Sequence, residues 1–195
     1  MLSGAPQFEV TYFDFLLLPD YEGTAIVVFN QDGQAVGSPS QTPVTRPERK
    51  TVGGVDYERT ATGIMAGTNL LALGASLSFA VDGDEIYLLI DPTTIRVYNR
   101  TTSALIRTVN LTLQDQADIN PSADDDLIRR NVEKIDVKDG KIYAGWRTPQ
   151  TQKFVLSSFS SAGEQEDIML VDEPYTDLST QEEMVSLVVS AASPP

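Results

Sequence analysis

The chain contains no cysteine and no histidine among its 195 residues. Without cysteine there is no disulfide framework, no thiolate nucleophile and no thiolate-bound metal. Without histidine the chain lacks the commonest general base, a frequent zinc or iron ligand and the central member of a Ser-His triad. An enzyme built from this sequence would have to work through aspartate, glutamate, lysine, tyrosine or serine. These absences favour a non-enzymatic function.

Positive charge is scarce as well. Lys and Arg number 14 against 28 Asp and Glu, which gives a formal net charge of −14. A charge of this sign opposes binding to nucleic acid and to anionic membranes, so we expect neither as a partner. Long apolar runs are also missing, because glycine, threonine and serine interrupt the uncharged segment 60–81. We expect no signal peptide and no transmembrane segment, and the sequence leaves the localisation open.

What the chain does contain is short apolar runs that alternate with polar residues. The clearest case is "AVDGDEIYLLIDPTTIRVYNRTTSALIRTVNL" (80–111), in which DGD, DPTT and NRTTS separate four such runs. A period of two predicts strands, and Asp-Gly between apolar runs predicts a tight hairpin. The segment therefore predicts a four-stranded antiparallel unit. The same signals predict strands at 7–18, 24–30, 34–37, 134–146 and 153–171.

Two segments lack this alternation. Residues 38–54 carry three prolines and the densest positive charge, and they predict an extended loop or arm. This arm is either a solvated connector or a contact with a neighbouring subunit, in which case Arg46, Arg49 and Lys50 are the candidate partner-binding residues. Residues 112–126 predict an acidic loop.

The pattern changes again near the end of the sequence. Ser179 and Glu182 stand at capping-box spacing, and Met184 and Val188 fall on one helical face. This arrangement predicts a short C-terminal helix and tail over 176–195, with Met184 and Val188 as candidates for docking on a neighbour. The β-branched valines of the same segment keep a strand as the alternative.

An internal repeat relates the strand segments. "TIRVYNRTTSALI" (94–106) and "KFVLSSFSSAGEQ" (153–165) share apolar alternation, an aromatic residue, a polar turn and a return strand, and "AIVVFNQDGQAV" (25–36) shares them more weakly. The hairpins "VDGDEIYLLI" (81–90) and "VKDGKIYAGW" (137–146) also correspond. Repeats of this length indicate units that bury their faces against one another. The pattern resembles a blade of the β-propeller class, in its quinoprotein-like or NHL-like variety.

We therefore predict an all-β fold of antiparallel meanders with a short C-terminal α-helix. The resemblance implies propeller-like packing, but a complete propeller needs at least four blades and the repeat supplies three, so a sandwich stays open. We assign residues 1–175 to the β domain, with its arm at 38–54 and its acidic loop at 112–126, and 176–195 to the helix and tail.

The acidic loop contains the one pattern that suggests a metal. Asp118, Asn120 and Asp124 fall at positions 1, 3 and 7 of a loop of the EF-hand kind, where oxygen ligands would surround Ca²⁺. Ala123 stands where the turn needs glycine, and Arg129 stands where a bidentate glutamate belongs. A solvated acidic loop is the better interpretation, so we assign no cofactor and keep calcium as the alternative.

These observations favour a non-enzymatic structural or assembly protein whose partners are protein subunits of the same assembly, identical copies or different chains. In lacking cysteine, in its acidity and in its arms around a β body, the chain resembles in style the small virion proteins of tailed phages, such as decoration, tail or baseplate subunits. One alternative is a carbohydrate-binding β module that stacks sugars on Tyr87, Tyr98, Tyr143 and Trp146. Another is a carboxylate-dependent hydrolase.

Overall fold

The structure is a computed structural model. It describes the backbone of strands Pro6–Asp14, Gly23–Phe29 and Ser40–Pro43, and residues 48–112, 132–147, 154–170 and 183–191. Sixteen strands lie within these residues, and every strand pairing is antiparallel. No helix of the described residues is long and apolar enough to cross a membrane.

The strands form four four-stranded sheets, numbered here I to IV. Sheet I has the order β16 (Glu183–Ala191), β1 (Pro6–Asp14), β2 (Gly23–Phe29) and β3 (Ser40–Pro43). Sheet II contains β4 (Arg49–Val52), β5 (Val55–Arg59), β6 (Ile64–Ala66) and β7 (Asn69–Leu71). Sheet III contains β8 (Ser78–Asp82), β9 (Glu85–Asp91), β10 (Thr94–Asn99) and β11 (Leu105–Asn110). Sheet IV contains β12 (Lys134–Lys138), β13 (Lys141–Arg147), β14 (Phe154–Phe159) and β15 (Gln165–Leu170).

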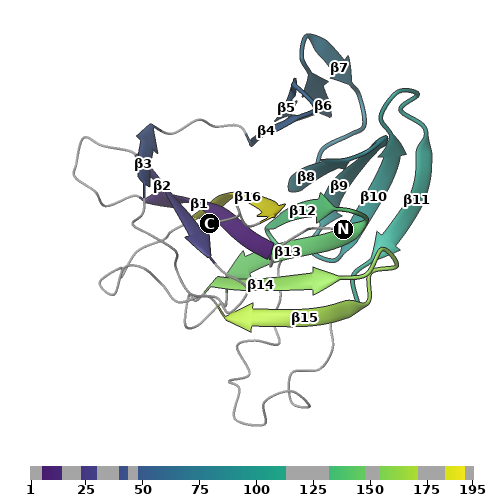
Figure 1. Ribbon diagram of the computed structural model, residues 1–195. Coiled ribbons are helices and arrows are strands. Elements are labelled where there is room, and N and C mark those ends of the chain that lie inside the picture. Colours follow the sequence, from purple (N-terminus) through teal and green to yellow (C-terminus); the bar gives the residue numbers. More distant parts are fainter. Residues whose placement is uncertain are drawn as a thin grey trace.

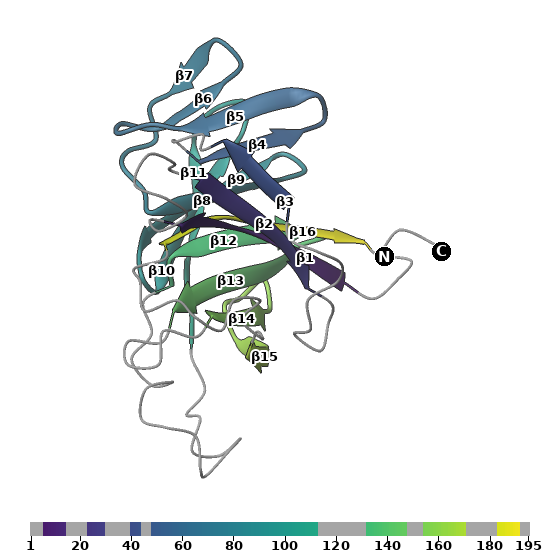
Figure 2. The same ribbon diagram turned by 90° about the vertical axis from the view of Figure 1, so that its left-hand side faces the viewer.

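The sheets pack face against face, and Figure 2 shows sheets II, III and IV one above another. Phe79 and Ile64 lie in the core between sheets II and III, whereas Trp146 and Phe159 lie in the core between sheets III and IV. The first strands of the sheets contact one another in turn, β4 with β8, β8 with β12, and β12 with β16. As a result β12 is buried on both faces from Lys134 to Val137.

The turns follow from residues that tolerate a left-handed backbone. Asp139 and Gly140 connect β12 to β13 with φ angles of 51° and 75°. A two-residue hairpin turn of type I′ needs positive φ at both central positions, which Asp-Gly supplies at low cost. The predicted hairpin around Asp139-Gly140 is therefore confirmed. The predicted four-stranded unit at 80–111 is also confirmed, as sheet III.

The predicted C-terminal helix is wrong over residues 183–191, which form β16. Figure 1 shows β16, in yellow, beside β1, in purple. Leu187 and Val189 are buried and Val188 is half-buried, which is the alternation of a strand. Pairing with the edge of β1 therefore prevails over the local capping signals, because tertiary contacts outweigh helix propensity in a segment rich in valine.

The predicted arm at 38–54 is also corrected. It contains β3 and β4, and β4 begins sheet II, a unit that the repeat did not reveal. The four strands of sheet II are only three to five residues long, so their alternation is too short to stand out in the sequence. The predicted strand at 34–37 and the acidic loop beyond Thr112 lie outside the described residues.

Candidate functional site

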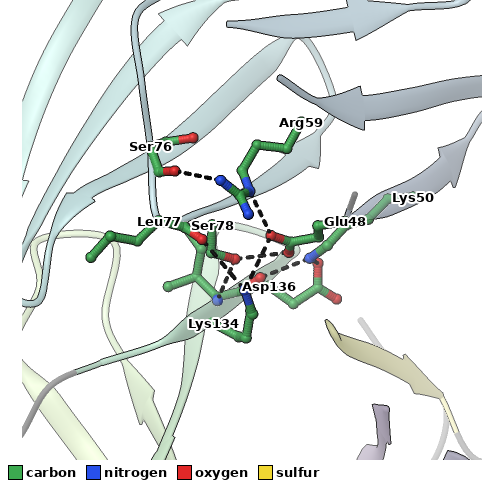
Figure 3. Close-up of polar contacts among 9 residues, drawn as sticks. Glu48, Lys50, Arg59, Ser76, Leu77, Ser78, Lys134 and Asp136 are labelled. Atoms are coloured by element: carbon green, nitrogen blue, oxygen red, sulfur yellow. Dashed lines mark hydrogen bonds and ion pairs between the residues drawn. The ribbon is translucent and has the colours of Figure 1, made fainter. Parts of the chain in front are cut away.

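Buried charged side chains gather where the first strands of the sheets meet, and Figure 3 shows them pointing toward one another. The junction cluster consists of Glu48, Lys50 and Arg59 from sheet II and the residue before it, Ser78 from sheet III, and Lys134 and Asp136 from sheet IV. The side chains of Glu48, Lys50, Lys134 and Asp136 are at most 11% exposed, whereas that of Arg59 is 30% exposed.

Strand geometry explains why these polar residues point inward. In β4 the side chains of Arg49 and Thr51 are exposed, so that of Lys50 between them points to the opposite face and is buried. Lys134 and Asp136 lie on β12, where both faces are covered by neighbouring strands. Alternation and burial together bring the three side chains to one place.

Lys50 and Asp136 form one half of the cluster. Lys50 Nζ donates to Asp136 Oδ1 at 2.9 Å and to the carbonyl oxygen of Ile135 at 2.7 Å. The other carboxylate oxygen of Asp136 accepts a hydrogen bond from the backbone N–H of Val189 at 2.7 Å. The Asp136 carboxylate therefore joins sheet IV to sheet II on one side and to β16 of sheet I on the other.

Glu48 is the centre of the other half. Its Oε1 accepts a hydrogen bond from Ser78 Oγ at 2.8 Å, and its Oε2 lies 3.5 Å from Arg59 Nε and 3.8 Å from Lys134 Nζ. Ser78 Oγ in turn accepts from the Ile135 N–H at 3.1 Å. Burial raises the pKa of the Glu48 carboxyl, and the charges of Lys50 and Lys134 offset that effect only in part.

The geometry of the cluster favours a role in joining the sheets. A buried carboxylate beside lysines can in principle exchange a proton with a substrate, but this requires access from solvent. A hollow of about 510 Å³ lies on sheet II, and the described residues that line it include Lys50 but not Glu48. The charged residues in that hollow are themselves paired, Arg49 with Glu58 at 2.6 Å and Asp56 with the hydroxyl of Thr51 at 2.6 Å.

A second charged group lies on the face of sheet III. The two terminal nitrogens of Arg107 donate to the two carboxylate oxygens of Glu85 at 2.6 and 2.8 Å, and the hydroxyl of Tyr87 donates to Glu85 at 2.6 Å. The hydrogen bonds from Arg107 hold the pKa of Glu85 below its usual value. Burial and the hydrogen bond to Glu85 raise the pKa of Tyr87 to about 12. The group joins β9 to β11 across β10.

Two large apolar side chains are exposed side by side at the start of β11. Leu105 is 54% exposed and Ile106 is 47% exposed, and β11 is the edge strand of sheet III. The pairing with β10 shifts register between Val97 and Tyr98, so a bulge lies at this point. A bulge twists an edge strand and exposes side chains that regular pairing would partly cover.

The residues predicted to bind a partner lie in different places. Arg49 is exposed and paired with Glu58, whereas Lys50 belongs to the junction cluster and has an internal partner. Met184 and Val188 lie on β16, and Arg46 falls outside the described residues. Their partner binding stays a prediction.

The other predicted site residues are Asp118, Asn120 and Asp124, and all three fall outside the described residues. Within the described part of the chain, no three His, Cys, Asp or Glu side chains are grouped to hold a metal. The aromatic residues Tyr87, Tyr98, Tyr143 and Trp146 are each at most 9% exposed and pack in the interior, so they do not form an exposed stacking face.

Sequence reasoning missed the junction cluster. Its charged residues are spread from position 48 to position 136, and a lysine in a short strand gives no sign of which face is buried. The alternation of Lys50 with Arg49 and Thr51 is visible in the sequence, but the arm interpretation concealed it.

No family model matches the chain, and no curated protein matches it. Two solved structures are similar to it in fold. Sqt1 from Saccharomyces cerevisiae has 10% sequence identity and a TM-score of 0.40, with 89% of this chain and 53% of that one covered. The computationally designed Ika8 protein has 10% identity and a TM-score of 0.36, with 74% and 45% covered. The chain thus spans about half the length of each.

Proposed function

We propose that the protein is a non-enzymatic structural subunit of a multi-subunit assembly, with its four sheets arranged like the blades of a propeller. The observation that carries the proposal is the exposed pair Leu105 and Ile106 on the edge of sheet III. Adjacent exposed apolar side chains on a sheet edge favour association with another protein, because burying them removes apolar surface from water.

The arrangement of the sheets supports the propeller-like part of the proposal. Each sheet is a four-stranded antiparallel meander or its equivalent, and β4, β8, β12 and β16 contact one another in succession. Sheet I combines the last strand with the first three, a pairing that joins distant parts of the chain. Four sheets meet the minimum for a propeller, which the three repeats found in the sequence did not.

The chemistry of the charged groups supports a structural role. Glu48, Asp136 and Glu85 each bind side chains or backbone groups of the protein itself, and the first two are buried. Buried pairs of this kind fix the mutual position of the elements that carry them. A virion component of a tailed phage, such as a decoration, tail or baseplate subunit, is the assembly that the style of the sequence favours.

Light scattering during size-exclusion chromatography tests the proposal. We expect the wild-type chain to form oligomers at high micromolar concentration, and we expect Leu105→Ser with Ile106→Ser to weaken association roughly tenfold or more. Leu70→Ser is the matched control, because Leu70 is 51% exposed on β7 of sheet II. A chain that stays a compact monomer, or a double variant that associates like the control, would contradict the proposal.

A carbohydrate-binding module is the second candidate, and the hollow on sheet II is the observation that favours it. Arg49, Asp56 and Glu58 line this hollow and carry groups that hydrogen-bond to sugar hydroxyls. A glycan array with the wild type and with Arg49→Ala tests this function. Binding lost in the variant would support it, and no binding by the wild type would remove it.

A further inference from the structure

Sheet I differs from the other three described sheets in how its strands follow one another in the sequence. Sheets II, III and IV each use four consecutive strands, whereas sheet I places β16 on the edge of β1. The register joins Pro6 to Ala191 at one end and Phe13 to Glu183 at the other. Figure 1 shows the two strands side by side near the middle of the molecule.

The contacts that hold β16 all come from residues far away in the sequence. β1 supplies backbone pairing, and β12 and β13 lie against the strand. Leu187 is fully buried and Val189 is 5% exposed. On the side of β16 away from β1, the N–H of Val189 donates to Asp136 Oδ2, and Lys50 holds that carboxylate in place. These groups, provided by sheets I, II and IV, form the acceptor site for β16.

None of these contacts depends on which copy of the chain supplies the strand. Pairing, side-chain burial and the Asp136 hydrogen bond are the same whether β16 comes from the same copy or from another one. An exchanged strand therefore assembles copies without any new complementary surface, and the equilibrium depends on protein concentration.

We propose that copies of this chain assemble by exchanging β16, so that the strand of one copy occupies the acceptor site of the next. The inference rests on the proposed function and names its partner, a second copy of the same chain. Because each copy carries a net charge of −14, the exchanged form gains from added salt, which screens the repulsion between copies.

Disulfide trapping tests the exchange, since the chain has no cysteine of its own. Glu9 and Val188 are opposite each other in the β1–β16 pairing, and Val188 is only half-buried. The variants Glu9→Cys and Val188→Cys are prepared separately, mixed at high concentration and oxidised mildly. A disulfide between the two variants forms by pairing only if the β16 of one copy lies on the β1 of the other. Gln7→Cys with Ser190→Cys, at another opposite pair, guards against a variant that does not fold.

The matched control is Arg49→Cys mixed with Glu58→Cys. These residues are opposite each other in the β4–β5 hairpin, which the short Gly53-Gly54 turn keeps within one chain. We expect the β1–β16 mixture to give roughly tenfold more of the mixed disulfide than the hairpin mixture, because pairing raises the effective concentration of the two thiols.

Equal yields from the two mixtures, or a Glu9→Cys/Val188→Cys double variant that forms its disulfide only within one chain, would overturn the exchange. Oligomers of the wild type that persist alongside such a result leave the assembly function standing and remove only the exchange. A wild type that is monomeric at every concentration overturns both.

Discussion

Asp136 is the residue whose carboxylate contacts the largest number of sheets. It binds Lys50 of sheet II and Val189 of sheet I while it belongs to sheet IV. A buried charge that loses its partner costs far more than an exposed one, because water cannot replace the lost contact. The stability of the junction cluster therefore depends on keeping its charges paired.

We expect Asp136→Ala to lower the free energy of unfolding by about 3–5 kcal/mol, because it leaves the Lys50 ammonium buried and unpaired. Urea denaturation followed by circular dichroism measures the change. Asp56→Ala is the control, since Asp56 is exposed and bonds only the neighbouring Thr51 among the printed contacts of the sheet; its effect should stay within about 0.5 kcal/mol. Similar losses in both variants would show that Asp136 is not special.

Glu48 gives a prediction about pH. Its pKa in the folded protein is raised above 4.5, so its contribution to stability is fully present below pH 4.5 and is lost as pH rises through the folded-state pKa. We expect the stability of the wild type relative to Glu48→Gln to fall above pH 4.5, by at most about 1.4 kcal/mol per pH unit. Urea titrations at several pH values measure the difference. A difference that grows with pH would mean that the nearby cations outweigh burial.

Tyr87 gives the corresponding prediction at alkaline pH. Its pKa is about 12 against an ordinary value of 10.0, so its contribution to stability is present below pH 10 and is lost as pH rises toward 12. The ultraviolet absorbance of ionised tyrosine measures the titration. The difference between wild type and Tyr87→Phe should show no ionisation at pH 10 and should appear only near pH 12. Ionisation at pH 10 would show that the hydrogen bond to Glu85 does not protect the phenol.

At the scale of single elements, sheets III and IV are joined at the end of β11 through Gly163. The carbonyl oxygen of Gly163 accepts a hydrogen bond from the Thr112 N–H at 2.7 Å, and its φ angle is +90°. A Cβ on this residue would meet the carbonyl oxygen of Asn110 and would lie 2.8 Å from Val109 Cγ1. Only glycine fits this close approach of the two sheets.

We therefore expect Gly163→Ala to destabilise the protein by about 1–3 kcal/mol more than Gly54→Ala does. Gly54 also has positive φ, at +76°, but a Cβ there meets nothing within 4 Å, so the control isolates the steric part of the effect. Thermal unfolding of both variants measures the difference. Equal midpoints would show that the two sheets can move apart without cost.

The elements that the sequence predicted best are those in which local and tertiary signals agree. In sheet III, Asp-Gly turns and long alternating runs point to the same answer as the packing, and the four strands were predicted. In β16 the local signal favoured a helix, and the edge of β1 and the Asp136 carboxylate decided for a strand. The junction cluster could not be predicted, because inward-pointing charges become recognisable only when sheets II, III and IV are brought together.

At the scale of the whole molecule, acidic residues outnumber basic ones by 28 to 14, so the folded chain repels itself. We expect the free energy of unfolding to rise with added sodium chloride, as the Debye length falls from about 30 Å at 0.01 M to about 8 Å at 0.15 M. Urea denaturation at a series of salt concentrations measures the change. A fall in stability would show that surface ion pairs such as Arg107–Glu85 outweigh the general repulsion.

The pairing of β1 with β16 has a consequence for how the protein is made. During synthesis β1 leaves the ribosome long before residues 183–191 are translated, so its edge waits without its final partner. At about 5–20 residues per second this delay is roughly ten to thirty seconds. In that time the open edge of β1 is exposed to other nascent chains on the same messenger, and a strand supplied by a neighbouring chain would fit it as well as the chain's own.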